Sequence, residues 1–389
     1  MRTATCGRST SVTEIYLDNN STTQPLPEVS ETVARHLCES YGNPSSRHSI
    51  GRKARRVLED SREQIAALLG ATPAELLFTS GGTEANNLAV LGLTPQHTGT
   101  LLISPGEHPS NLEPCKIRER QGWKLETIPV DSSGLFPADV SSYPPFAWEQ
   151  VRLAAVILAH NETGVIQQIE PLLEQARRFG FPVHLDGVQV VGKLPLQFRQ
   201  LGATTLSFGA HKFHGPRGVG GLLIREGVRL TPDFAVGGLQ ETGRRAGTEP
   251  VALIAGMAKA LELWHKTQAA RTAHVAQLRD HFAARLQAIA APAIVNGEAA
   301  SRLPNTLNIS FPGADGEALL VALDLEGIAC SLGSACASGS IEPTPILVAM
   351  GLAPERYRSA VRLTLSHLNT RDEIEAAASR IAEIVKYLR

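Results

Sequence analysis

The stretch Ser207-Phe208-Gly209-Ala210-His211-Lys212-Phe213-His214-Gly215-Pro216 decides how the chain is interpreted. The run 203–208 is mostly apolar and predicts a buried strand, and a second apolar run, 219–224, follows a series of glycines. Lys212 therefore stands at the end of a strand, where burial makes a lysine amine a better nucleophile. Enzymes use such an amine to form a Schiff base with a carbonyl substrate or with pyridoxal phosphate (PLP). The alternative is an ordinary surface lysine.

Strand-like and helix-like runs alternate on the N-terminal side of this stretch. Strands are predicted over 76–79, 100–104, 124–130, 153–159 and 183–186, and helices over 26–37, 49–69, 83–87, 109–122 and 171–179. This alternation predicts an α/β fold with a mainly parallel sheet covered by helices, whose ligands bind at the carboxyl ends of the strands. The polar candidates near such ends are Thr83, His108, Asn161, Asp186, His211 and Lys212.

Residues 76–87 predict a strand, a turn at Gly81-Gly82, and a helix with Thr83 as its N-cap. Backbone amides at a helix N-terminus, approached closely through glycines, form an anion site. Many α/β folds carry the same unit for packing alone.

The pattern changes after residue 224. Residues 237–248 predict a loop, 250–266 and 270–288 predict two long helices, and a smaller α/β unit follows from residue 294. We expect a large domain over 15–260 and a small domain over 261–389, with residues 1–14 disordered or packed on the small domain. Glycines and small residues surround Cys336, which predicts a loop with an exposed thiol.

Composition excludes several classes of protein. The net charge of −1 and the absence of a basic run argue against a nucleic-acid partner, and no apolar run is long enough to span a bilayer. Five cysteines, without a Cys-x-x-Cys pair or an export signal, predict reduced thiols, a cytoplasmic location and no metal site.

Motifs along nearly the whole chain carry a resemblance to one family. They are Tyr16-Leu-Asp-Asn-Asn-Ser-Thr-Thr, Gly42-Asn-Pro-Ser-Ser-Arg-His, Phe78-Thr-Ser-Gly-Gly-Thr-Glu-Ala-Asn-Asn, His160-Asn-Glu-Thr-Gly, His184-Leu-Asp-Gly-Val-Gln, His211-Lys-Phe-His-Gly-Pro-Arg-Gly-Val-Gly, Arg245-Ala-Gly-Thr-Glu-Pro and Gly333-Ser-Ala-Cys. The chain resembles the cysteine desulfurases of the class V aminotransferase family, the type that serves iron–sulfur cluster assembly. The resemblance implies a PLP-binding domain of the fold type I aminotransferase kind, with a seven-stranded-type sheet, and a smaller C-terminal domain.

The resemblance also implies a reaction and partners. PLP-dependent removal of sulfur from L-cysteine would give L-alanine and a persulfide on Cys336, the nucleophile. The sulfur would pass to an acceptor such as an iron–sulfur scaffold protein, and a homodimer would share its active sites. Selenocysteine lyase or an aminotransferase on the same fold is an alternative, and a non-catalytic PLP-binding scaffold in a sulfur-transfer complex is another.

Roles for single residues follow from the same resemblance. Lys212 would hold PLP, Asp186 its pyridinium nitrogen and Gln189 its phenolic oxygen, while His108 would stack on the ring and move protons. The remaining expected contacts are Gly82, Thr83, His211 and the second subunit's Thr248 at the phosphate, and Asn161 and Arg362 at the substrate carboxylate, with Asn161 also near the cofactor. The alternatives are a helix N-cap for Asp186 and a structural ion pair for Arg362.

One position departs from the family pattern. The family usually has a serine two residues before the histidine of its His-Lys pair, and its hydroxyl contacts the phosphate. This chain has Gly209 there. We therefore expect PLP to be held more loosely than in the family, unless the backbone or a water compensates.

Overall fold

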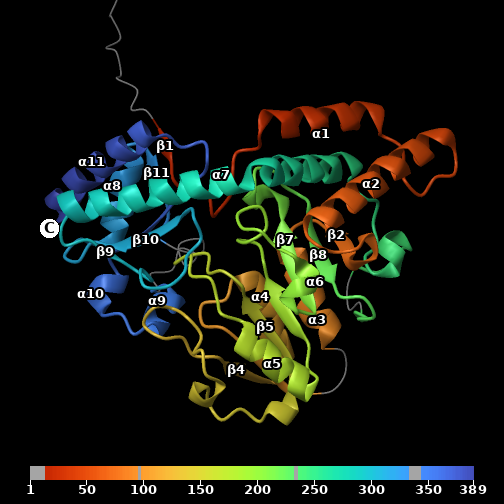
Figure 1. Ribbon diagram of the computed structural model, residues 1–389, viewed down its shortest axis with the longest axis horizontal. Coiled ribbons are helices and arrows are strands. Elements are labelled where there is room, and N and C mark those ends of the chain that lie inside the picture. Colours follow the sequence, from red (N-terminus) through yellow and green to blue (C-terminus); the bar gives the residue numbers. More distant parts are fainter. Residues whose placement is uncertain (1–13, 95–97, 232–234, 333–342) are drawn as a thin grey trace, which may run out of the picture.

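The computed structural model describes residues 14–94, 98–231, 235–332 and 343–389. Within them the chain forms two lobes that one long helix, α7 (Val251–Ile289), connects. Figure 1 shows α7 running across both lobes, with the large sheet on one side and helices α8 and α11 at the far end. Each lobe has a core of its own, and α7 contributes side chains to both.

The large lobe is built on a seven-stranded sheet in the order β2-β8-β7-β6-β5-β3-β4. Only β8 runs antiparallel to its neighbours among these described strands, so the mainly parallel sheet predicted from the sequence is confirmed. Its strands are β2 (Leu76–Thr79), β3 (Thr100–Ile103), β4 (Lys124–Thr127), β5 (Val151–Ile157), β6 (Val183–Asp186), β7 (Thr205–Gly209) and β8 (Gly220–Ile224). The central strands β5 and β6 are buried at every position except Arg152, because helices and loops cover both of their faces.

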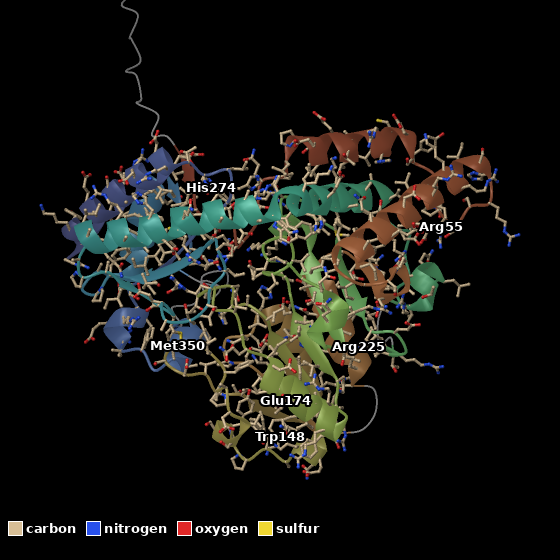
Figure 2. All side chains as sticks on the ribbon, viewed as in Figure 1. Arg55, Trp148, Glu174, Arg225, His274 and Met350 are labelled. Atoms are coloured by element: carbon tan, nitrogen blue, oxygen red, sulfur yellow. The ribbon has the colours of Figure 1, made fainter. Side chains whose placement is uncertain are left out.

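Helices cover this sheet and connect its strands. They are α1 (Pro27–Glu39), α2 (Ser49–Leu68), α3 (Gly82–Leu93), α4 (Pro109–Arg120), α5 (Glu170–Phe179) and α6 (Phe198–Leu201). Short 3₁₀ turns lie at η1 (Pro73–Glu75), η2 (Val140–Ser142), η3 (Trp148–Gln150), η4 (Ala210–Lys212) and η5 (Gln240–Gly243). In Figure 2, Trp148 of η3 and Glu174 of α5 lie at the edge of the large lobe that is farthest from α7.

The small lobe combines a three-stranded antiparallel sheet, β12-β10-β9, with a two-stranded parallel one, β1-β11. Its elements are β1 (Ile15–Tyr16), β9 (Ile294–Val295), β10 (Thr306–Ser310), α8 (Gly316–Leu325), β11 (Ile328–Ala329), α9 (Pro345–Ala349), α10 (Pro354–Tyr357), β12 (Ala360–Thr364) and α11 (Arg371–Leu388). Ile15 and Leu17 pack in its core. The first described residues therefore belong with the small lobe by packing, although we had assigned them to the large domain.

The two long helices expected over 250–266 and 270–288 are one helix, so that prediction is wrong. Residues 267–269, which separate the two expected helices, are Thr-Gln-Ala, and no glycine or proline lies there to stop a helix. They are instead the stretch in which α7 passes from one core to the other, between buried Trp264 and buried Val275. His274, labelled in Figure 2, marks this exposed part. Among the helices of the described residues, none is long and apolar enough to cross a membrane.

Candidate active site

A cavity of about 180 Å³ lies where the central strands of the large sheet end. Its walls are Gly82, Thr83, His108, Ser110, Ile157, Asn161, Asp186, Val188, Gln189, His211 and Lys212. The structure therefore brings together eight of the residues that the sequence singled out, from the ends of β2, β3, β5, β6 and β7. Parallel strands end at one edge of the sheet, which is why residues far apart in sequence meet here.

Lys212 ends the short turn η4 that follows β7, and its amine is held by backbone carbonyls. Its Nζ donates to the carbonyl oxygens of Asn20 and Ser21, at 2.6 and 2.9 Å. Burial, with repulsion from Arg362, lowers the pKa of Lys212 to about 8. A larger share of this amine is therefore unprotonated, and nucleophilic, near neutral pH than for an exposed lysine.

Asp186 is fixed by hydrogen bonds at both oxygens. Oδ1 accepts from the backbone N–H of Val188 at 3.0 Å, and Oδ2 accepts from Asn86 Nδ2 at 2.8 Å. Asn86 is oriented in turn by His184, because the Asn86 side-chain oxygen contacts Nε2 of the His184 ring. The other ring nitrogen of His184, Nδ1, contacts the Thr205 hydroxyl. Asp186 caps no helix in the described chain, so the N-cap alternative is not what the structure has.

His108 is the N-cap of α4, and that position fixes its ring. Nδ1 accepts from the backbone N–H of Ser110 at 3.1 Å, so the neutral ring carries its proton on Nε2. Burial lowers the pKa of His108, which keeps the ring neutral near pH 7. The same Ser110 hydroxyl contacts both His108 and Asn86, and this links His108 to the hydrogen-bond network of Asp186.

The N-terminus of α3 forms one wall of the cavity. The helix begins at Gly82 with Gly81 as N-cap, so the prediction of Thr83 as N-cap is wrong. Gly81 has a φ of 156°, which glycine adopts readily because it has no β-carbon. This explains why the helix is capped by Gly81 and not by Thr83. A β-carbon on Gly82 would lie 2.5 Å from Val188, so this close approach also requires glycine. The first-turn amides, with Thr83 and His211 beside them, suit an anion.

Arg362, on β12, is occupied by protein acceptors. Nη1 contacts Glu162 Oε1 at 3.1 Å, and Nη2 contacts Asp18 Oδ1 at 2.9 Å and the Ser21 hydroxyl at 2.9 Å. The ion pair that we considered as an alternative is therefore present. Arg362 does not line the cavity, whereas Asn161, which we paired with it, does.

Two residues that do not line the cavity but hold residues of its wall, Lys193 and Asn20, received no role in the sequence analysis. Lys193 Nζ donates to Gln189 Oε1 and to Asn20 Oδ1, and Gln189 Nε2 donates to the Asn20 carbonyl at 3.0 Å. Because lysine has only donors, it fixes which side of the Gln189 amide carries oxygen. Asn20 also bonds Asn305 and Thr306 of the small lobe. Asn20 lay inside a quoted motif, but no periodic pattern pointed to Lys193.

Two expected residues lie elsewhere. Thr248 is exposed just before α7 and does not line the cavity of its own chain. Cys336 lies outside the described residues. Among the described cysteines, Cys115 and Cys330 have pKa values raised to about 12 by burial, which makes their thiols poor nucleophiles and suits a structural role. The groups of side chains searched in the described chain include no candidate metal site.

The sequence pattern described as aminotransferase class-V matches residues 15–377. The chain belongs to this family. The family membership expected from the motifs is thus confirmed, and PLP is the family's cofactor.

Relatives with names and solved structures cover nearly all of the chain. It is 38% identical to "Cysteine desulfurase IscS" of Dictyoglomus turgidum over 379 residues, 97% of this chain and 95% of that protein. It is 41% identical to "Cysteine desulfurase" of Klebsiella pneumoniae over 377 residues, 97% and 94% of the two chains. A solved "NifS-like protein" aligns with a TM-score of 0.88 at 33% identity and covers 97% of this chain and all of its own.

Proposed function

We propose that this protein is a cysteine desulfurase, which removes sulfur from L-cysteine, releases L-alanine and leaves a persulfide on Cys336. The observation that carries this is the meeting of Lys212, Asp186 and His108 in one cavity against the N-terminus of α3. The names of the relatives support the same activity.

The cavity suits PLP in its donor set. Lys212 would bond the cofactor covalently, and Asp186 would hold its ring nitrogen. Gln189 uses one of its two amide hydrogens on the Asn20 carbonyl, and the other would be donated to the phenolic oxygen of PLP. The first-turn amides of α3, Thr83 and His211 would hold the phosphate. When bound, PLP supplies an electron sink for the Cα of an amino acid.

The chain's own groups would then move protons and sulfur. The Lys212 amine, with a pKa of about 8, is suited to take a proton from the substrate, and His108 Nε2 to hold one at the ring's face. The Cys336 thiolate would attack the substrate sulfur. The new S–S bond would form as the C–S bond of the substrate breaks. The electron pair of that C–S bond would go to the carbon that becomes the alanine methyl group.

A dimer and an acceptor complete the proposal. Thr248 of a second subunit would complete the phosphate site; within its own chain Thr248 is exposed and does not line the cavity. An iron–sulfur scaffold protein would take the persulfide sulfur, and a cytoplasmic location remains a prediction from the reduced cysteines.

Mass spectrometry of the Cys336 peptide after incubation with PLP and L-cysteine tests the activity. We expect a persulfide on Cys336 and an equal amount of alanine, both absent in Lys212→Ala, and no persulfide in Cys336→Ser. Amino transfer to a keto acid without sulfur release would instead favour an aminotransferase. A preference for selenocysteine would favour the lyase, and no turnover would favour a scaffold.

A further inference from the structure

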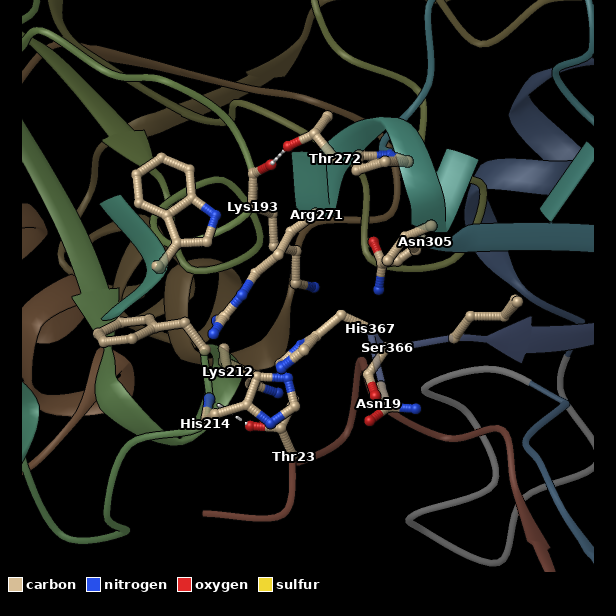
Figure 3. Close-up of a pocket in the computed structure, with 16 residues that line it drawn as sticks. Asn19, Thr23, Lys193, Lys212, His214, Arg271, Thr272, Asn305, Ser366 and His367 are labelled. Carbon is tan, nitrogen blue, oxygen red and sulfur yellow. Dashed lines mark hydrogen bonds between the residues drawn. The ribbon is translucent and has the colours of Figure 1, made fainter. Parts of the chain in front are cut away.

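A second cavity lies behind Lys212, between the two lobes. Figure 3 shows Lys193, Lys212 and His214 from the large lobe facing Asn305, Ser366 and His367 from the small lobe, with Arg271 of α7 between them. Asn19 and Thr23 close the remaining side. Lys212 lines both this cavity and the catalytic one, so the two share a wall.

The lining of this second cavity is basic and contains no acidic residue. Its titratable side chains are Lys193, Lys212, His214, Arg271 and His367. Arg271 makes no hydrogen bond or ion pair with any described residue, and the only carboxylate that acts on its charge is that of Glu28, on α1. Arg271 is only partly buried, so its five donors, which no described residue accepts from, are open to water or to a bound acceptor.

The basic groups also act on one another. The rings of His214 and His367 meet edge to face with centroids 4.7 Å apart. Burial is the main cause that lowers the pKa of His214 to about 4 and that of His367 to about 3, and repulsion from Arg271 contributes to both. Arg271 therefore lies close to both rings, which are neutral near pH 7, so the guanidinium is the charged group that an anion in this part of the cavity would meet.

The size of the cavity limits what it can hold. The space open to the centres of water molecules is about 50 Å³. One water needs roughly 10–15 Å³ in this measure, so only a few water-sized groups fit. A phosphate, a sulfate or a small carboxylate has that size, whereas a nucleotide or a second PLP does not.

We propose that this cavity binds a small oxyanion, with Arg271 as the principal contact. The anion joins the lobes, because α7 and residues 366–367 meet residues 193 and 214 around it. It also lies beside Lys193, which orients Gln189 at the catalytic cavity. Occupation of this site therefore favours one arrangement of the lobes around the catalytic cavity.

The test uses PLP-loaded enzyme without cysteine, so that PLP already fills its own phosphate site. Trp264 lines the second cavity, and its fluorescence reports occupancy. We titrate phosphate, sulfate and acetate at constant ionic strength set with chloride, and subtract the signal of Trp264→Phe, which retains the other tryptophans. We expect a saturable change with at least one oxyanion and none with chloride. Phosphate or sulfate alone would identify a tetrahedral oxyanion, and acetate alone a carboxylate.

Variants then locate the site. Arg271→Gln should raise the dissociation constant about tenfold or more, as expected for the loss of a charged hydrogen bond. The dissociation constant of Arg271→Lys should lie between that of Arg271→Gln and that of the wild type. Arg285→Gln, on the same helix but paired with Glu375 at the surface, should bind like wild type. Unchanged binding by Arg271→Gln overturns the proposal, and so does a wild-type enzyme whose Trp264 signal does not saturate.

Discussion

At the scale of single residues, the Lys212 amine sets the pH dependence of cofactor capture. Burial disfavours its charged form and lowers its pKa to about 8, and only the unprotonated amine attacks the PLP aldehyde. The rate of PLP capture by the PLP-free enzyme should therefore rise about tenfold per pH unit below about pH 8 and level off above it. Stopped-flow measurement of the visible absorbance checks this. A flat profile contradicts it, and visible absorbance in Lys212→Ala would place the Schiff base elsewhere.

Lys193 is expected to act as a positioning residue through Gln189. In Lys193→Met the Gln189 amide keeps only its bond to the Asn20 carbonyl, so its oxygen can turn more readily toward the phenolic oxygen of PLP and repel it. We expect a shifted visible absorbance and PLP affinity lowered about tenfold, the loss of roughly one hydrogen bond to a charged group. Lys193→Arg, which keeps a donor at this position, should restore part of the wild-type absorbance and part of the PLP affinity. Thermal stability without PLP separates this role from a structural one, because an apolar side chain should not destabilise the site. Equal spectra and equal affinities would refute it.

Gly209 faces the N-terminus of α3 and has room for a side chain. A β-carbon there would lie 3.4 Å from the Gly82 nitrogen and 3.5 Å from the His211 ring, which are ordinary contacts. Gly209→Ser should therefore place a hydroxyl near the expected phosphate and tighten PLP binding roughly tenfold to a hundredfold, as one added hydrogen bond to a charged group would. PLP titration after removal of the cofactor with hydroxylamine measures this. Equal dissociation constants would mean that the phosphate is already satisfied.

At the scale of elements, one buried ion pair anchors the segment that carries Thr248. Arg62 of α2 contacts Glu241 at 2.6 and 2.9 Å, and Glu241 also accepts from the Phe78 amide at 3.0 Å. Both Glu241 and Thr242 have positive φ, 48° and 57°, which is an unfavourable backbone conformation for residues other than glycine. The bonds of Glu241 to Arg62 and Phe78 stabilise the segment in this conformation.

Removal of one partner should be costly at this position. Glu241→Ala leaves the buried Arg62 guanidinium with only Glu59 and the Leu76 carbonyl, and we expect the free energy of unfolding to fall by about 3 kcal/mol, the low end of the cost of breaking a buried pair. The control is Glu170→Ala, which breaks an exposed pair with Arg177 and should change it by less than about 1 kcal/mol. Urea denaturation compares the two. Similar midpoints for both variants would show that the Arg62 pair does not anchor the segment.

At the scale of the whole molecule, sharing of sites between subunits is directly testable. Lys212→Ala lacks the covalent site, and Thr248→Val would lack the contact that a partner supplies. In a mixed dimer one site would combine intact Lys212 with intact Thr248, so activity at limiting PLP should exceed the mean of the separate variants. Mixing followed by exchange and assay measures this. A fully active isolated monomer, or strict averaging, contradicts the shared site.

The sequence by itself determined the alternation of strands and helices, the glycine turn before α3, and the family. These are local signals: an apolar run, a glycine turn and a lysine at a strand end are written in neighbouring residues. Most of the catalytic cavity followed from them, because strand ends of a parallel sheet always meet at one edge. The continuity of α7 was missed, because whether a polar stretch ends a helix depends on which cores lie on each side of it.

Only the tertiary structure decided what each side chain contacts. Arg362 had the right type for a substrate carboxylate, but Asp18 and Glu162, 344 and 200 residues away, occupy it. Lys193 and Arg271 carried no pattern, and the motif that contains Asn20 did not show its contacts, since these roles depend on distant segments packed around one junction between the lobes. Burial and the sum of neighbouring charges set the pKa of Lys212, and both arise only when the chain is folded.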